Sequence, residues 1–416
     1  MKNNKDNYIS LICVGNELFY NVLNTNVHIA SRVCGLNGFD IGFNIIVPDN
    51  IKEIVRAVDF CLKNSSVLMI SGGLGPTFDD ITREAISIYM ERKLIFSSCA
   101  WEEIQQRFRE RKMISIPEKN RKQAMIIEGA DFISNSVGTA PGMMVKHNDK
   151  LIFLLPGPPW EFEEMLKNSV IPILKKTFLG HSFIRKVFGI AGESEVVVEE
   201  KTDEIRDIIK SFGGEWTILA KPHLVELWLK VPYSKKELFN QVENFLKKTF
   251  NDSFLGDCSI PEGLASVLKE KKLVCCFAES CTGGLAGHLM TELPGVSQCF
   301  NGSIVAYSNR VKRRILRVSR STLKKYGAVS EQTAIAMAKG ARKYGKADVS
   351  LAITGIAGPE GGSVEKPVGL VCMAVALSNR QIQTKVFHFT GQRSIIKLRS
   401  ALAGIDFLRR AIIKDF

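Results

Sequence analysis

A serine in a glycine-rich turn is the first residue whose type and position could support chemistry. Ser280 lies between an apolar segment typical of a buried strand and a segment typical of a helix. In α/β proteins ligands bind where strands end, and N–H groups at a helix start can hold a phosphate or an oxyanion. Thr282, Gly283 and Gly284 complete the turn, and glycines let a backbone approach a substrate closely. Ser280 is therefore a candidate nucleophile, although the same pattern fits a plain turn in which a serine caps the helix.

A serine nucleophile needs a base, and the sequence offers a lysine more readily than a histidine. His288 lies roughly 10 Å further along the expected helix by helix rise. Lys312 and Tyr307 instead follow the next expected strand. A lysine acts as a base only when burial or neighbouring cations lower its pKa, and three arginines adjoin it: Arg310, Arg313 and Arg314. The alternative is that Lys312 belongs to an ordinary solvated basic face.

Cys281 is a rival nucleophile in the same turn. A thiolate at a helix N-terminus would have a lowered pKa. Adjacent side chains on such a turn point in different directions, so only one of Ser280 and Cys281 should face a pocket, and the residues alone do not choose between them. The ten cysteines include no CxxC pair, so we expect reduced thiols, mostly buried as small hydrophobic residues.

Two later strand ends also carry residues suited to ligand binding. Thr354, Gly355 and Gly358 belong to a second glycine-rich loop that directly follows an apolar strand, which favours backbone contact with a ligand over a flexible connector. Arg393 follows another strand and could hold a phosphate or a carboxylate with two parallel hydrogen bonds.

A third glycine-rich loop lies near the N-terminus and precedes several acidic residues. Its ligand-binding candidates are Gly72, Gly73, Gly75 and Thr77, followed by Asp80. Glycine amides beside carboxylates suit a phosphate that is bridged by a hard divalent cation. The alternative is that the carboxylates Asp79, Asp80 and Glu84 complement a helix dipole. The loop matches neither a Walker A motif nor GxGxxG.

The expected strands and helices around these loops indicate an α/β protein with three parts. Strand-like and helix-like segments alternate over 1–172, which indicates a largely parallel sheet. Ile51, Ile54, Val55, Val58 and Leu62 share one helical face, and Pro159 suits the first turn of a later helix. A small α+β module is expected over 173–258, with an alternating strand at 224–231 and a capping box formed by Ser234 and Glu237. A second α/β domain follows over 259–416.

Charge and hydrophobicity narrow the functional classes. The chain of 416 residues has a net charge of +13, and residues 261–416 hold 24 Lys and Arg against 10 Asp and Glu. This excess suggests an anionic ligand for the C-terminal domain. The basic residues are scattered and lack interleaved stacking aromatics, so nucleic acid is not the expected partner. No apolar run approaches the roughly 18 residues that span a bilayer, so we expect a cytoplasmic protein without a membrane partner.

Taken together, the motifs closely resemble the CinA family, named for competence/damage-inducible protein. The resemblance covers nearly the whole chain and is most specific in the C-terminal part. The motifs that carry it are VGNEL (14–18), NTN (24–26), SGGLGPTFDDITREA (71–85), GTAPGM (138–143), LPGPPWE (155–161), FGIAGESE (188–195), AESCTGG (278–284), GSIVAYSN (302–309), GAVSEQT (327–333) and ITGIAGPEGGSVEKPVG (353–369).

The resemblance implies a fold and an activity for each part. The first part is similar to the MoaB/Mog-like molybdopterin-binding fold, which in this family is associated with metal-dependent ADP-ribose pyrophosphatase activity. The middle part resembles a KH-like module. The last part resembles nicotinamide-nucleotide amidase, which converts nicotinamide mononucleotide (NMN) to nicotinate mononucleotide and ammonia.

The resemblance also assigns roles to residues. Ser280 is the expected nucleophile, Tyr307 and Lys312 the acid–base or orienting groups, and Arg393 a substrate contact. Gly157 joins the nucleotide-binding loop of the first domain. A divalent cation (Mg²⁺, Mn²⁺ or Co²⁺) is expected near Asp80, with Glu17 or Glu161 as a co-ligand, whereas the amidase needs no cofactor. The expected partners are NMN, ADP-ribose and a second copy of the chain in a homodimer.

The sequence is also compatible with two other classes of function. The first fold alone would suit a pterin-binding protein without hydrolytic activity. The family name and the basic C-terminal domain would suit a DNA-associated competence factor.

Overall fold

The computed structural model describes residues 8–20, 22–113, 115–178, 183–377 and 381–415. The chain divides into two compact units, one formed by 1–185 with 232–234 and the other by 186–231 with 235–416. The second unit thus contains most of both the middle module and the C-terminal domain. The expected domain boundaries near 172 and 258 stay a prediction.

The first unit is built on a mixed six-stranded sheet with the order β2-β1-β3-β8-β7-β6. The first four strands are parallel, and β7 and β6 complete the sheet in antiparallel orientation. The parallel part agrees with the alternation of strands and helices in the sequence. The strands are β1 (Tyr8–Val14), β2 (Asp40–Val47), β3 (Val67–Ser71), β6 (Asp131–Ile133), β7 (Gly142–His147) and β8 (Lys150–Leu155).

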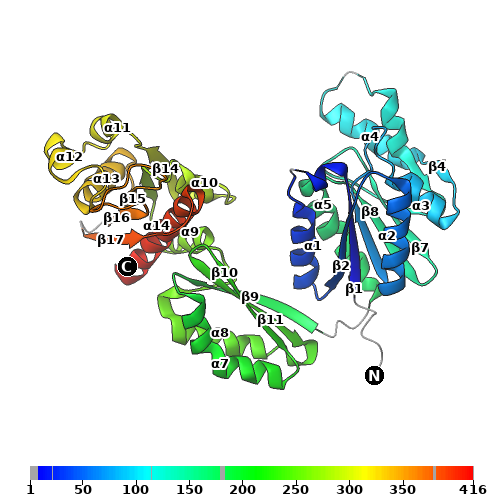
Figure 1. The fold of residues 1–416 in the computed structure, drawn as a ribbon, viewed down its shortest axis with the longest axis horizontal. Coiled ribbons are helices and arrows are strands. Elements are labelled where there is room, and N and C mark those ends of the chain that lie inside the picture. Colours follow the sequence, from blue (N-terminus) through cyan, green and yellow to red (C-terminus); the bar gives the residue numbers. More distant parts are fainter. Residues whose placement is uncertain (1–7, 21, 114, 179–182, 378–380, 416) are drawn as a thin grey trace. The chain divides into compact units, whose positions relative to one another are not determined.

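Helices cover both faces of this sheet (Figure 1). One face carries α1 (Thr25–Leu36), α5 (Pro159–Met165) and α6 (Ile171–Thr177), and the other carries α2 (Ile51–Asn64) and α3 (Thr82–Met90). The remaining elements of this unit are η2 (Asn16–Phe19), β4 (Leu94–Phe96), α4 (Ser98–Glu110), η3 (Glu118–Ala124), β5 (Met125–Ile127) and η4 (Leu166–Val170).

Two expectations for these helices are confirmed. Ile54, Val58 and Leu62 of α2 are buried against the sheet, as their spacing predicts. Helix α5 begins at Pro159, where a proline costs no hydrogen bond because the first N–H groups of a helix have no partner inside it.

The middle module is an α+β unit with the sheet order β10-β11-β9-β12. Alternate residues of β11, including Val225, Leu227 and Leu229, are buried, as the period of two predicts. The expected capping box of Ser234 and Glu237 is wrong, because 3-10 turn η5 occupies the position of Ser234 and α8 begins without a side-chain cap. The elements are β9 (Phe183–Ala191), α7 (Glu195–Ser211), β10 (Glu215–Lys221), β11 (Leu224–Pro232), η5 (Tyr233–Lys235), α8 (Leu238–Phe250), η6 (Asn251–Ser253) and β12 (Phe254–Gly256).

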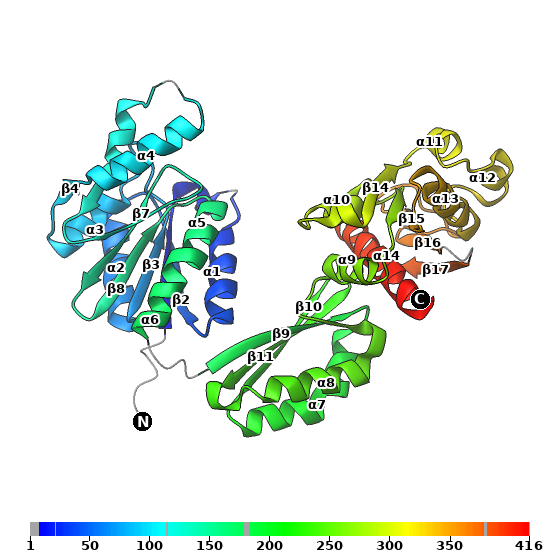
Figure 2. The same cartoon turned by 180° about the vertical axis from the view of Figure 1, so that it is seen from behind.

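The C-terminal part has a five-stranded sheet with the order β14-β13-β15-β16-β17, in which the first three strands are parallel. Helices α9, α10 and α14 cover one face, and α13 covers the other (Figure 2). The elements are α9 (Ile260–Glu270), β13 (Cys275–Glu279), α10 (Leu285–Thr291), η7 (Val296–Gln298), β14 (Phe300–Val305), α11 (Asn309–Arg314), α12 (Arg320–Tyr326), α13 (Glu331–Tyr344), β15 (Val349–Gly355), β16 (Leu370–Ala376), β17 (Ile382–His388) and α14 (Arg393–Asp415).

The cysteines agree with the expectation that most of them are buried. All ten cysteines lie in the described part of the chain as free thiols, and eight of them are buried. Within the described ranges, none of the helices combines the length and the apolar character that crossing a bilayer requires.

Candidate functional site

The C-terminal ends of two parallel strands bring a serine and a lysine together. Ser280 follows β13, and its backbone N–H donates to the carbonyl oxygen of Ile353 on the neighbouring strand β15. Lys312 lies on the short helix α11, which follows strand β14 on the other side of β13. Lys312 Nζ donates a hydrogen bond of 2.9 Å to Ser280 Oγ. Two residues that are 32 positions apart therefore form a nucleophile–amine pair of the kind used in acyl transfer.

The environment of Lys312 suits a base. The residue is 1% exposed, and burial lowers the pKa of its amine from 10.5 to about 8. The lowering has burial as its cause, so the neighbouring arginines suggested by the sequence are not needed to explain it. Within the described residues, Lys312 forms no ion pair with a carboxylate that would restore its usual pKa. At neutral pH a useful fraction of this amine is therefore uncharged.

Two carbonyl groups orient the amine. Lys312 Nζ also donates to the carbonyl oxygens of Ala306 and Tyr307, at 2.7 and 3.1 Å. When the amine is neutral, its two protons can serve these carbonyls, and its lone pair then faces the hydroxyl of Ser280. The geometry thus favours transfer of the serine proton to Lys312.

The two candidate nucleophiles are both buried but differ in the pKa of the thiol and in contact with Lys312. Cys281 is 5% exposed, and burial raises the pKa of its thiol to about 12, which disfavours the reactive thiolate. Ser280, at 8% exposure, is the residue whose side chain contacts the amine of Lys312. These observations favour Ser280 over Cys281 as the candidate nucleophile.

The turn that carries Ser280 is held by Glu279, which the sequence analysis did not single out. Its carboxylate is fully buried and accepts four hydrogen bonds. The donors are the N–H groups of Gly284, Ala286 and Gly287 and the hydroxyl of Ser303. Helix-start N–H groups that lack intrahelical partners are thereby satisfied by one side chain.

Thr282, Gly283 and Gly284, the other residues predicted in the turn, differ in their hydrogen bonds. Gly283 N–H donates to the carbonyl of Ser280, and Gly284 N–H is taken by Glu279, so neither is free to bind an oxyanion. Thr282 is fully buried, and its hydroxyl has no hydrogen-bond partner within the described part of the chain. The φ angles of Gly283 and Gly284 are positive, at 63° and 99°, a backbone conformation that glycine adopts more readily than other residues.

The remaining C-terminal candidates lie around this turn or support it. Tyr307 is 65% exposed, and the contact it makes with Lys312 is through its carbonyl. Thr354 is buried and donates to Ala328, in a structural role. Arg393 donates to the carbonyl oxygen of Gly358 at 2.6 Å, which ties the second glycine-rich loop to the start of α14.

Lys397 lies near the turn and was not predicted from the sequence as a site residue. Lys397, on the first turns of α14, brings its Nζ to 3.7 Å from the position that a Cβ at Gly283 would occupy. In the described ranges it makes no hydrogen bond or ion pair. Its spacing from Arg393, four residues along a helix, was the only sequence signal, because nothing local connects it to residue 283.

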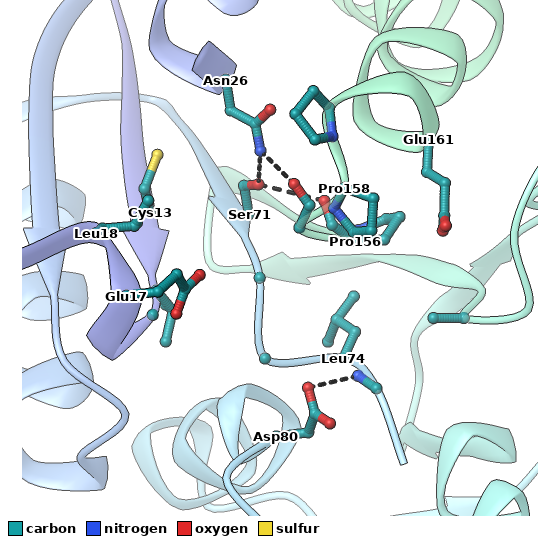
Figure 3. A pocket seen from close by; sticks show the side chains of 18 of the residues that line it. Cys13, Glu17, Leu18, Asn26, Ser71, Leu74, Asp80, Pro156, Pro158 and Glu161 are labelled. Carbon is teal, nitrogen blue, oxygen red and sulfur yellow. Dashed lines mark hydrogen bonds between the residues drawn. The ribbon is translucent and has the colours of Figure 1, made fainter. Parts of the chain in front are cut away.

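In the first unit, the predicted nucleotide and metal residues line one pocket of about 530 Å³ (Figure 3). The glycine-rich loop after β3 forms one wall, and the start of α5 forms another. All eight predicted residues line this pocket: Glu17, Gly72, Gly73, Gly75, Thr77, Asp80, Gly157 and Glu161. The sequence therefore selected residues that the fold brings together from three separate segments.

The charges of this pocket are all of one sign among its described lining residues. No lysine, arginine or histidine is among the described lining residues. Five carboxylates line the pocket: Glu17, Asp49, Asp79, Asp80 and Glu161. A phosphorylated ligand would be repelled there unless a cation accompanied it. The donor set of carboxylate oxygens suits a hard divalent cation.

The individual carboxylates are held in different ways. Asp80 accepts hydrogen bonds from the N–H groups of Gly75 and Thr77, at 2.7 and 2.8 Å, so it also shapes the loop. Glu161 accepts from Asn135 at 2.8 Å, and burial raises the pKa of its carboxyl group. Among the described residues, no three acidic, histidine or cysteine side chains converge closely enough to form a metal site. The metal assignment therefore stays a prediction.

Asn26 is a further residue of this pocket that was not selected as a site residue. Its side-chain amide donates to Ser71 and to the carbonyl of Gly157, both at 2.7 Å (Figure 3). This amide joins α1 to the two loops that form the pocket. The NTN motif at 24–26 was its sequence signal.

Comparison with known proteins gives two family matches. A family described as "CinA C-terminal domain" matches residues 258–412, and one described as "Probable molybdopterin binding domain" matches residues 10–176. The chain is similar to a "Putative competence-damage inducible protein" of Caldicellulosiruptor saccharolyticus, with 38% identity over 97% of this chain and 98% of the relative. A "CinA-like protein" of Dictyoglomus turgidum also has 38% identity, with the same coverage.

Solved structures resemble parts of the chain. The protein CinA of Thermoplasma acidophilum, described as of unknown function, is 30% identical and has a TM-score of 0.38, with 42% of this chain and 99% of that chain covered. A competence/damage inducible protein of Agrobacterium tumefaciens is 38% identical and has a TM-score of 0.36, with 37% of this chain and 95% of that chain covered.

Proposed function

This chain belongs to the CinA family, and on that premise we propose that its C-terminal domain hydrolyses the amide of NMN to give nicotinate mononucleotide and ammonia. The observation that carries the proposal is the hydrogen bond between Lys312 Nζ and Ser280 Oγ, formed by an amine whose pKa is lowered to about 8. This pair supplies a nucleophile and a base for breaking an amide.

The reaction follows from the orientation of the pair. Lys312 takes the proton of Ser280 Oγ as that oxygen attacks the carboxamide carbon of NMN. Within the described residues, the N–H groups of Cys281 and Thr282 donate to no carbonyl or carboxylate oxygen, so they are the turn's donors for the oxygen that becomes negative. Lys312 then returns the proton to the departing nitrogen, and ammonia leaves. Water hydrolyses the resulting ester with Lys312 again as base, which frees Ser280 and nicotinate mononucleotide.

Binding of the substrate phosphate is assigned to the start of α14. Lys397 lies close to Gly283 and has no competing ion pair within the described residues. Arg393 is exposed at the first position of the same helix, and N–H groups at a helix start add to the attraction for an anion. The charge excess of this domain is in keeping with a phosphorylated substrate.

The direct test is ammonia release from NMN by the full-length protein and by Ser280→Ala. We expect the variant to lose at least about 10³-fold in kcat, because within the described residues Lys312 contacts no hydroxyl other than that of Ser280. The matched control is Ser350→Ala, which removes a buried hydroxyl on strand β15 that donates to the carbonyl of Ala338 on helix α13, and it should keep wild-type kcat. Activity should survive EDTA. A fully active Ser280→Ala protein would refute the assignment.

For the N-terminal domain we propose metal-dependent hydrolysis of ADP-ribose. Support comes from the pocket of about 530 Å³, whose glycine-rich loop suits a pyrophosphate. Its five carboxylates would repel that pyrophosphate unless a cation offset their charge. Asp80 would hold that cation, with Glu17 or Glu161 as a co-ligand. Its chemistry would be to offset the negative charge of the pyrophosphate and to activate water.

The experiment compares AMP formation from ADP-ribose with Mg²⁺, Mn²⁺, Co²⁺ or EDTA. Glu161→Gln should lower the rate with every metal, whereas Glu163→Gln, a change on the same helix outside the pocket, should leave it unchanged. Absence of turnover with all three metals would end this proposal. Binding of a pterin under the same conditions, without any product, would instead favour the function named by the molybdopterin-binding family.

A further inference from the structure

Glu279 is a buried acidic residue for which the amide-hydrolysis scheme has no direct use. It ends strand β13, immediately before Ser280, and its side chain is fully buried. Within the described residues, no lysine, arginine or histidine forms an ion pair with it. Burial of a carboxylate without a cation is costly unless hydrogen bonds replace water. Here four such bonds are present, so the position of this carboxylate is closely specified.

The four donors divide evenly between the two carboxylate oxygens. Oε2 accepts from the N–H groups of Gly284 and Ala286, at 2.9 and 3.0 Å. Oε1 accepts from the N–H of Gly287 at 2.8 Å and from the hydroxyl of Ser303 at 2.6 Å. Three of these donors belong to the end of the turn or the first residues of α10, and the fourth belongs to strand β14. The carboxylate therefore links the end of the turn and the start of α10 to strands β13 and β14.

Close packing around this carboxylate leaves little room for movement. A Cβ at Gly287 would lie 2.7 Å from Ser303 Cβ and 3.3 Å from Glu279 Oε1, so only glycine lets α10 approach this closely. The N-cap residue of α10, Gly284, offers no side chain to satisfy the helix start. Glu279 performs that capping from the preceding strand.

We propose that Glu279 is a positioning residue, which holds the turn 280–284 so that Ser280 Oγ stays within reach of Lys312 Nζ. This inference rests on the proposed amidase function. Glu279 and Ser280 are consecutive, so the carboxylate fixes the backbone on one side while the serine hydroxyl faces the amine on the other. A displacement of the turn by about 1 Å is enough to lower the rate about 10²-fold.

Glu279→Gln is the variant that tests the proposal in the full-length protein. A glutamine keeps the size of the side chain, but its NH₂ group cannot accept. In one orientation it would face the N–H groups of Gly284 and Ala286, and in the other the N–H of Gly287 and the Ser303 hydroxyl. We expect kcat for NMN to fall about 10²-fold while KM changes less than about 3-fold. The pH at which kcat reaches half its maximum should stay where it is in the wild type, because Lys312 keeps its own surroundings.

Two serine variants provide a matched pair that avoids a charge change. Ser303→Ala removes one of the four donors to Glu279, whereas Ser350→Ala removes a buried hydroxyl that donates to Ala338. We expect Ser303→Ala to lower kcat about 3- to 10-fold and Ser350→Ala to leave it unchanged. If Glu279→Gln does not fold, the two serine variants still test whether the hydrogen bonds of Glu279 position the turn. Equal activities for the two serine variants, or wild-type kcat in folded Glu279→Gln, would overturn the proposal.

A substrate-independent readout separates this proposal from the proposed function. Phenylmethylsulfonyl fluoride forms a sulfonyl ester on an activated serine oxygen, with fluoride as the leaving group, and intact-mass spectrometry measures its rate. We expect Ser280 to be labelled about 10²-fold more slowly in Glu279→Gln than in the wild type. If the wild type is labelled but releases no ammonia from NMN, the substrate assignment fails while the labelling rates still judge Glu279. Equal labelling rates would contradict the positioning role.

Discussion

Replacing Lys312 by arginine keeps a positive charge at the site but removes its ability to lose a proton, since the guanidinium pKa exceeds 12. In the wild type the pKa of about 8 makes about a quarter of the amine neutral at pH 7.5. An ordinary lysine with a pKa of 10.5 would be only about 0.1% neutral at that pH. Burial of Lys312 thus enlarges the population of the basic form by about two orders of magnitude.

The expected result is a loss of about 10²- to 10⁴-fold in kcat for Lys312→Arg, the usual contribution of a positioned base. Wild-type kcat should rise with pH and level off above about pH 8, because the neutral amine is the active form. Ammonia release from NMN, coupled to a dehydrogenase, measures both quantities. Arg313→Lys, an exposed change on the same helix α11, should leave kcat and its pH profile unaltered.

Either of two results would refute this reasoning. Retention by Lys312→Arg of more than about a tenth of the wild-type kcat would show that proton transfer does not need this amine. A wild-type kcat that is constant between pH 6 and 9 would show that no group with the pKa of Lys312 controls the reaction.

Three further outcomes are expected. Between pH 7 and 9 the unfolding free energy of the wild type should rise by about 1 kcal/mol relative to Lys312→Met, since the unfolded chain binds more protons to this amine. Urea titrations at the two pH values measure this difference, and an unchanged difference would contradict it. Lys397→Ala should raise KM for NMN about 10-fold with kcat nearly constant, and an unaltered KM would exclude the phosphate contact. Asp406→Asn should lower the unfolding free energy by about 3 kcal/mol or more, because Arg409 and Arg410 lose their buried carboxylate; a melting temperature equal to that of the wild type would contradict this.

The fold was largely predictable because its signals are local. The single helical face of α2, the alternation of buried residues in β11 and the proline at the start of α5 each follow from spacing within one element. The capping box at Ser234 and Glu237 failed because its four-residue pattern cannot exclude a 3-10 turn at the same place. Local patterns identify elements more securely than their ends.

The candidate site was predictable only where residues follow strand ends. Ser280 was predicted as a nucleophile with Lys312 as a possible base. The burial that lowers the pKa of Lys312, and the carbonyls of Ala306 and Tyr307 that orient its amine, arise only in the folded domain. Glu279 was missed because a carboxylate at the end of an apolar strand has no sequence signature for its four donors. Such donors converge from α10 and β14, and only the folded sheet brings them together.

The central claim is that Ser280 Oγ forms a covalent bond to the substrate carbonyl carbon, and rapid acid quenching of the reaction with NMN tests it directly. Digestion and mass spectrometry should find the peptide that contains Ser280 heavier by the nicotinate mononucleotide acyl group, with no such species in Ser280→Ala. An adduct on Cys281, or steady ammonia release by Ser280→Ala, would contradict the account.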